Sequence, residues 1–250
     1  MSAIEWTEKT WNPVTGCTKV SSGCKNCYAE TMAKRLKAMG AAGYENGFEL
    51  TCHENRISYP LKIKKPTVFF VNSMSDLFHE NIPFSFIDSV MDTITQTPRH
   101  CYQILTKRPY VMKKYFDQRG VVPENSWIGV SVENKRHGVP RIDVLRSIKT
   151  KSIRFLSIEP LLEDLGEINL KNIDWAIVGG ESGHKARIMK PIWVDNIHRQ
   201  CIEQNTPFFF KQWGTWGMDG IKRQKSKNGR IYKNQEWNES PIIFQNKAII

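Results

Sequence analysis

The 250-residue chain lacks a long apolar run, and its basic residues outnumber its acidic ones. No stretch approaches the roughly 20 residues that span a bilayer, so we expect no membrane-spanning segment. Residues 1–8 show no basic segment followed by an apolar stretch, and we therefore expect no secretory signal. Without export, the six cysteines are expected to be reduced thiols or metal ligands rather than disulfides. A cytoplasmic protein without membrane contact is the resulting prediction.

The shortage of acidic residues leaves a formal net charge of +11, with 36 Lys and Arg against 25 Asp and Glu. Such an excess can attract nucleic acid or another polyanion, although surface lysines alone produce it in many proteins. Residues 221–233 contain no acid and carry the cations Lys222, Arg223, Lys225, Lys227, Arg230 and Lys233. We expect this polar stretch to lie outside the core, either as a solvated loop or as an arm that contacts phosphates.

Short apolar runs recur along the chain, and helix-like segments often follow them. The runs are residues 67–71, 102–105, 127–130, 153–156, 175–178 and 208–210. Four prolines stand where the first turns of the intervening helices are expected: Pro83, Pro109, Pro140 and Pro191. Repeated βα units predict an α/β fold with a parallel sheet, either doubly wound or closed as a barrel. We expect Cys201, on the apolar face of its helix, and Cys101, at a strand start, to pack in the core.

Polar residues follow every expected strand, and this favours a barrel with a polar pocket. The strand ends are residues 72–76, 106–108, 131–134, 157–160, 179–183 and 211–213. Ligands bind at the carboxyl ends of parallel strands. Glu159 directly follows a strand and is expected to line the pocket. Lys107 and Arg108 either bind a phosphate or carboxylate or lie in solvent.

Three of the six cysteines, Cys17, Cys24 and Cys27, lie in one loop with the spacing C-x6-C-x2-C. Thiolates are soft ligands, so this cluster indicates a metal site. No His, Cys, Asp or Glu follows Cys27 until Glu30. A closed zinc site needs four protein ligands, whereas an iron-sulfur cluster held by three cysteines leaves one iron open. The loop therefore favours an open cluster. A zinc site completed by residues 52–53, a Cys-His pair, is the alternative.

Seven stretches of the sequence resemble the phage-associated three-cysteine-motif family, which is radical-S-adenosylmethionine-like. They are WNPVTGC, GCKNCYAE, FFVNSMSDLFHE, QILTKRP, IGVSVEN, FLSIEPLL and IVGGESG. The resemblance extends from about Trp6 to Trp216. It implies a partial (β/α)6-type TIM barrel over residues 1–216, followed by a basic C-terminal extension over residues 217–250. It also implies a 4Fe-4S cluster and S-adenosylmethionine (SAM) as cofactors.

Carried over by position, the resemblance implies that Cys17, Cys24 and Cys27 ligate three irons while the fourth binds SAM. The cofactor contacts, with Glu159 added from its strand end, are Asn72, Ser73, Ser75, Asp76, Ser131, Glu133, Glu159, Gly179 and Gly180. Asp76 or the serine hydroxyls accept from the SAM ammonium group. Ser131 and Glu133 face the ribose, and the glycine pair faces the adenine. The chain departs from the superfamily in its first cysteine gap, six residues instead of three, and in Asn26, which replaces an aromatic residue.

The resulting hypothesis is a radical SAM enzyme that cleaves SAM and abstracts hydrogen from a substrate whose reacting position stays open. It requires an electron donor. The charge and the phage association favour nucleic acid or a nucleotide as substrate, and the family's gene arrangement suggests a separately encoded protein partner. Two alternatives remain. One is a zinc-bearing nucleic-acid-binding module without catalysis, and the other is a barrel enzyme whose cluster is only structural.

Overall fold

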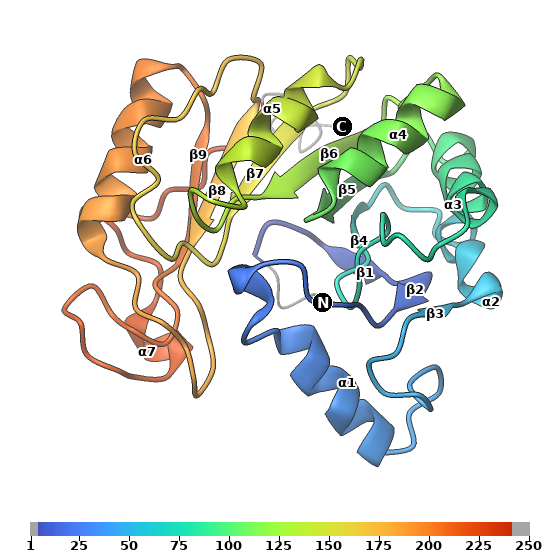
Figure 1. The fold of residues 1–250 in the computed structure, drawn as a ribbon, viewed down its shortest axis with the longest axis horizontal. Helices are drawn as coiled ribbons and strands as arrows, with labels where there is room; N and C mark the ends of the chain where they lie inside the picture. The colour runs from blue at the N-terminus through green and yellow to red at the C-terminus, as the bar shows by residue number, and fades with distance from the viewer. Residues whose placement is uncertain (1–4, 242–250) are drawn as a thin grey trace. The chain divides into compact units, whose positions relative to one another are not determined.

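The computed structural model describes residues 5–241 and has the predicted α/β fold (Figure 1). Seven strands form one sheet in the order β1-β4-β5-β6-β7-β8-β9, and β2 and β3 form a separate antiparallel pair. The strands are β1 Lys9–Trp11, β2 Val14–Thr15, β3 Thr51–Cys52, β4 Val68–Val71, β5 Cys101–Thr106, β6 Ser126–Ser131, β7 Arg154–Ile158, β8 Trp175–Gly179 and β9 Phe208–Gln212.

The six strands expected from the apolar runs are all present, as β4 to β9. Their sequential order, with parallel pairing in β4/β5, β7/β8 and β8/β9, confirms the predicted fold class, a partial barrel of βα units. The sequence did not indicate β1, which also pairs in parallel with β4. This strand has only three residues, and Lys9 and Thr10 interrupt its apolar character.

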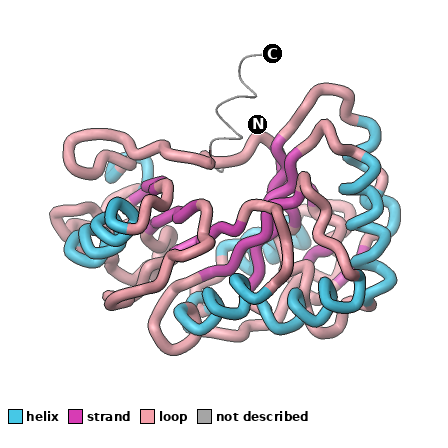
Figure 2. Tube along the Cα trace, turned by 90° about the horizontal axis from the view of Figure 1, so that it is seen from above, coloured by secondary structure: helices cyan, strands magenta, loops and turns pink. Residues whose placement is uncertain are grey.

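Four helices begin within one residue of the prolines expected in their first turns, which are Pro83, Pro109, Pro140 and Pro191. The helices are α1 Tyr28–Ala38, α2 Glu54–Ile57, α3 Phe84–Gln96, α4 Pro109–Arg119, α5 Val139–Ser147, α6 Pro191–Glu203 and α7 Lys225–Asn228, with short 3-10 turns η1 Ser22–Cys24 and η2 Tyr59–Lys62. Proline fits the first helical turn because the backbone N–H that it lacks would have no acceptor within the helix at that position. Residues 159–174, which join β7 to β8, contain no helix. Figure 2 distinguishes the helices, the strands and the loops between them by colour. No helix in residues 5–241 is long and apolar enough to cross a membrane.

The contacts divide the chain into two compact units, of which unit 1 comprises residues 1–20, 27–129 and 147–152. Its core is aromatic: Phe69 of β4 stacks on Tyr102 of β5 with ring centroids 5.4 Å apart, and Trp11 of β1 packs against Tyr102 at 5.6 Å. The helix α3 buries one face, which includes Ile87 and Val90. Burial of this apolar surface is the main stabilising term, and it fixes the carboxyl ends of β4 and β5.

Unit 2 comprises residues 21–26, 130–146 and 153–250. Its strand β9 packs against α6 through Phe208 and His198, whose ring centroids lie 4.7 Å apart. Tyr232 is 2% exposed and contacts both rings. The expectation that residues 222–233 lie wholly outside the core is therefore wrong at Tyr232, whose ring is buried although most of the stretch is polar. The boundary at residue 217 stays a prediction.

Two cysteines outside the loop were expected in the core. Cys201 is 1% exposed on α6, which confirms the prediction, and burial raises the pKa of its thiol to about 12. Cys101 is only half-buried at the first position of β5, so the prediction is wrong there. A residue at a strand's first position is covered by fewer neighbours than one in its middle.

Candidate functional site

The carboxyl end of β4 carries the first group of predicted cofactor contacts, beginning with Asn72. Asn72 has a left-handed backbone with φ 58°, its N–H donates to the Trp11 carbonyl at 2.8 Å, and its Oδ1 accepts from the Val14 N–H at 3.3 Å. The side chain is 3% exposed, yet Nδ2 has no hydrogen-bond partner in the described part of the chain. A buried donor without an acceptor is costly, so this amide is a candidate contact for a bound ligand.

The two serines beside Asn72 donate their hydroxyl hydrogens to the protein. Ser73 Oγ donates to Asn12 Oδ1 at 3.1 Å, and Ser75 Oγ donates to the Val14 carbonyl at 2.8 Å. A hydroxyl oxygen that donates its single hydrogen still has lone pairs. Both oxygens can therefore accept from an ammonium group, as predicted for SAM.

Asp76 is placed differently, because the protein already occupies its carboxylate. Oδ1 accepts from the Phe78 N–H at 3.0 Å and from Thr106 Oγ1 at 2.7 Å, and Oδ2 accepts from the Lys107 N–H at 3.0 Å and from Arg108 Nη1 at 3.2 Å. An ionised carboxylate has about four lone-pair sites. Asp76, which is 6% exposed, thus joins the ends of β4 and β5, and the serine hydroxyls are better suited to accept from a ligand.

From the sequence, Arg108 was expected either to bind a phosphate or carboxylate or to lie in solvent. In the structure it is 5% exposed and binds groups of the protein. Its guanidinium contacts Asp76, Glu80 and the cysteine loop, where Nη1 lies 3.4 Å from Cys17 Sγ. The loop itself enters through Gly16, whose φ of +79° and close approach to the Glu49 carbonyl leave no room for a side chain.

Cys27 lies in the same unit, at the N-cap of α1. It packs against Ala29, Ala33 and Met74, and the next residue, Tyr28, donates its hydroxyl to the Ser73 carbonyl. The N-terminal end of a helix favours a negative group, which suits a thiolate ligand. Unit 1 therefore positions two of the three cysteines beside the end of β4.

The middle of the cysteine loop, residues 21–26, belongs to unit 2 and includes Cys24. The Ser22 carbonyl accepts from Arg187 Nη1 at 3.0 Å, and its hydroxyl accepts from Asn134 Nδ2 at 2.7 Å. A Cβ at Gly23 would lie 3.0 Å from the Glu133 side chain. This segment is therefore fixed by side chains that follow β6 and β8.

Ser131 and Glu133, the predicted ribose contacts, are 1% and 0% exposed. Arg141 Nη1 donates at 2.7 Å both to the Ser131 carbonyl and to Glu133 Oε2. This buried ion pair braces the end of β6 against α5 and supports Gly23. The role of these two residues toward a cofactor stays a prediction.

Glu159, Gly179 and Gly180 lie together at the ends of β7 and β8. The Glu159 carboxylate accepts from Lys211 Nζ at 3.0 and 2.9 Å, and a Cβ at Gly179 would lie 3.3 Å from Glu159 Cδ. At Gly180 a Cβ would lie 2.0 Å from the Trp213 carbonyl oxygen. Close backbone packing therefore accounts for Gly180, whereas a side chain at Gly179 would press on the Glu159–Lys211 ion pair.

Sequence reasoning missed the pair formed by Glu181 and Arg187. Arg187 donates Nε to Glu181 Oε2 at 2.9 Å and Nη2 to Oε1 at 2.6 Å, and Asn26 Nδ2 donates to Oε2 at 3.1 Å. Burial alone would raise the pKa of Glu181. The hydrogen bonds from Arg187 and Asn26 lower this pKa by more than burial raises it, so it lies below the ordinary value for a glutamate. The signal in the sequence was Asn26, a polar residue where the superfamily has an aromatic one.

In residues 5–241 no group of three His, Cys, Asp or Glu side chains is arranged to hold a metal ion. Cys17 and Cys27 belong to unit 1 and Cys24 to unit 2, so ligation by all three stays a prediction. The donor set nevertheless suits an iron-sulfur cluster. The three thiols are half-buried and not disulfide-bonded, and Cys17 faces a buried cation.

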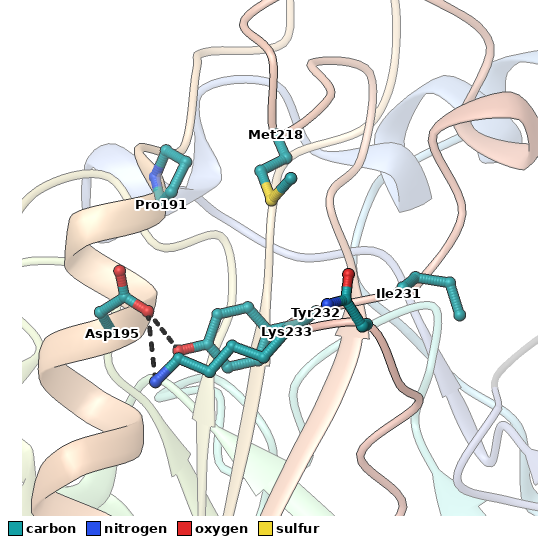
Figure 3. A pocket seen from close by; sticks show the side chains of 7 residues that line it. Pro191, Asp195, Met218, Ile231, Tyr232 and Lys233 are labelled. Carbon is teal, nitrogen blue, oxygen red and sulfur yellow. Dashed lines mark hydrogen bonds and ion pairs between the residues drawn. The ribbon is translucent and has the colours of Figure 1, made fainter.

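A cavity of about 320 Å³ lies elsewhere in unit 2, at the start of α6. Figure 3 shows Asp195 facing Tyr232 and Lys233 across it; Tyr232 donates its hydroxyl to Asp195 Oδ1 at 2.5 Å. Met218 and Ile231 supply apolar lining. None of the predicted site residues lines this cavity, so it does not contribute to the candidate site.

A family model described as "Protein of unknown function (DUF5131)" matches residues 1–241. No curated protein matches the sequence. Among solved structures, a cysteine-to-serine mutant of spore photoproduct lyase is 14% identical with a TM-score of 0.48, over 80% of this chain and 64% of that one. A double mutant of spore photoproduct lyase with bound AdoMet and dinucleoside spore photoproduct is 14% identical with a TM-score of 0.44, over 76% and 60%. The chain thus spans less than two thirds of both, and likenesses this distant carry no argument about function.

Proposed function

We propose that this chain, which belongs to the family described as "Protein of unknown function (DUF5131)", is a radical SAM enzyme. The observation that carries the proposal is the loop of three cysteines without a fourth ligand, ahead of a parallel βα sheet. When bound, a 4Fe-4S cluster and SAM supply one-electron cleavage of SAM and hydrogen abstraction from a substrate. Cys17, Cys24 and Cys27 would hold the cluster.

The end of β4 supports a SAM subsite. The unpartnered Asn72 Nδ2 is a donor that suits the carboxylate of SAM, and the Ser73 and Ser75 oxygens are acceptors that suit its ammonium group. The backbone that carries these groups is fixed by hydrogen bonds to Trp11 and Val14. We therefore expect the subsite to exist before the ligand binds.

The net charge of +11 supports nucleic acid or a nucleotide as the substrate. Most of the cations in residues 222–233 contact the protein itself. Lys222 donates to the His184 carbonyl at 2.7 Å, Arg223 pairs with Asp219 at 2.6 Å, and Arg230 lies over the Phe209 ring. Lys225 and Lys227 are both exposed on α7, and this exposure makes them the positions at which to test for phosphate contacts. An electron donor, a cytoplasmic location, phage association and a separate protein partner also remain parts of the proposal.

Anaerobic reconstitution with iron and sulfide, followed by metal analysis and visible and electron paramagnetic resonance (EPR) spectra, tests the cluster. We expect Cys17→Ala, Cys24→Ala and Cys27→Ala each to lose it, because each removes one thiolate from a site without a spare ligand. Cys52→Ala is the matched control, since Cys52 is exposed. A wild-type protein that binds zinc and no iron, or a Cys52→Ala protein that loses its metal, would favour the zinc module instead.

Addition of SAM to the reduced protein tests the open iron. We expect a change in the EPR signal, and a weaker change in Asn72→Ala at equal SAM, because that variant lacks the unpartnered amide donor. Asn81→Ala is the matched control, since it removes an amide a few residues beyond the subsite. An unchanged signal with no binding by calorimetry would indicate a structural cluster.

A further inference from the structure

The guanidinium of Arg108 uses all five of its N–H donors inside unit 1. Nε donates to Glu80 Oε2 at 2.7 Å. Nη1 donates to Asp76 Oδ2 at 3.2 Å and to Cys17 Sγ at 3.4 Å. Nη2 donates to the Thr18 carbonyl at 3.0 Å and to the Thr18 hydroxyl at 2.9 Å. Because guanidinium has five N–H groups in a planar fork, these five acceptors fix its position completely.

The same contacts leave Arg108 no donor for an external anion. It therefore does not serve as the phosphate or carboxylate site that the strand end allowed. Three of its acceptors belong to the cysteine loop, namely Cys17 Sγ and the carbonyl and hydroxyl oxygens of Thr18, and the other two are carboxylates that hold it there. The arginine thus connects the end of β5 to the first cysteine of the loop.

The positive charge on Arg108 is secure. A guanidinium does not lose its proton in proteins, so this side chain is a permanent cation. The side chain is also anchored from its own backbone, because the Arg108 N–H donates at 2.8 Å to Thr106 Oγ1, which donates to Asp76. A fixed cation in a poorly solvated place interacts strongly with a nearby sulfur.

We propose that Arg108 is a positioning residue that raises the reduction potential of the iron-sulfur cluster through its hydrogen bond to Cys17 Sγ. This inference rests on the proposed function, since Cys17 must be an iron ligand for the contact to act on a cluster. Reduction adds one electron, and a cation that donates to a ligand sulfur stabilises the added negative charge. Loss of the arginine therefore makes the cluster harder to reduce.

The test compares wild type with Arg108→Gln, Arg108→Lys and Arg119→Gln after anaerobic reconstitution. Iron content, thermal unfolding and the midpoint potential from an EPR-monitored titration are measured for each. Arg119 is the matched control, because it lies on α4 and pairs with Asp88 and Asp92 without contacting the loop. Lysine at position 108 keeps a charge near Asp76 but loses the planar fork.

We expect a more negative midpoint potential in Arg108→Gln, a smaller shift in the same direction in Arg108→Lys, and the wild-type potential in Arg119→Gln. If Arg108→Gln does not fold, Arg108→Lys decides by the same criterion. If the wild-type protein binds the cluster and the Arg108 variants have the same midpoint potential as the wild type, this inference alone is overturned. A wild-type protein without iron overturns both this inference and the proposed function.

Discussion

Each unit holds its part of the cysteine loop with one arginine and one buried carboxylate, but the two pairs differ in what the arginine reaches. Arg108 in unit 1 donates to the Cys17 sulfur, whereas Arg187 in unit 2 donates to the Ser22 carbonyl. The Arg108 side chain is 3% exposed and that of Arg187 is 30% exposed. The first contact can alter the electronic properties of a bound cluster, and the second can only position the backbone that carries Cys24.

The largest loss of stability is expected from Asp76→Ala, which removes the buried carboxylate that holds Arg108 in unit 1. The substitution leaves Arg108 as a buried charge with Glu80 as its remaining ion-pair partner, and it leaves three further donors without an acceptor. We expect a loss of about 3–5 kcal/mol in the free energy of unfolding, measured by urea denaturation. Asp92→Ala, at an ion pair whose carboxylate is 58% exposed, is the control and should cost less than about 1 kcal/mol. Equal losses in both variants would mean that the Asp76 pair is no more important than a surface pair.

A smaller effect is expected from Arg187→Gln, because the Arg187 side chain is 30% exposed and water can reach its ion pair with Glu181. We predict a loss of roughly 1–3 kcal/mol in unfolding free energy. In the reconstituted protein, iron should be removed faster by a chelator while the midpoint potential stays at the wild-type value. A shifted potential would show that Arg187, like Arg108, affects the cluster directly.

The Glu181 pair also predicts a pH dependence in unit 2. The pKa of Glu181 is lowered from the ordinary 4.5. The folded state therefore keeps this carboxylate ionised at a pH at which the unfolded chain protonates it. Its contribution to stability is therefore fully present above pH 4.5 and is lost as the pH falls below that value. The difference in unfolding free energy between wild type and Glu181→Gln should shrink in acid. A difference that is constant from pH 6 to pH 3 would contradict the assignment.

The smallest effect concerns the exposed cations of unit 2. Changing Lys225 and Lys227 together to Gln should reduce the salt dependence of duplex DNA binding, with a slope smaller by up to about 0.9 for each lost contact. Lys149→Gln with Lys151→Gln in unit 1 is the matched control for charge. Identical slopes in all three proteins would direct the search for a substrate to small molecules or proteins.

The sequence predicted the fold well because its strands are continuous apolar runs bounded by turn residues. It missed β1, since Lys9–Trp11 carries no such run and becomes a strand through pairing with β4. The site was harder to predict. Asp76 stood where a ligand contact was expected, but Thr106 and Arg108 occupy its carboxylate from the next strand end. The pairing of hydrogen-bond donors with acceptors at neighbouring strand ends depends on the register between the strands. The spacing of residues along one strand does not contain that information.

The extension beyond residue 216 covers the outer edge of β9. The Phe210 N–H donates to the Trp237 carbonyl at 3.0 Å, and the Phe208 N–H donates to the Glu239 carboxylate at 2.8 Å. A chain ending at residue 216 would expose the edge strand Phe208–Gln212, three of whose five residues are phenylalanine. Uncovered apolar edges pair with those of other molecules, so such a truncation should aggregate during expression. The extension therefore protects solubility, whether or not its cations meet a phosphate.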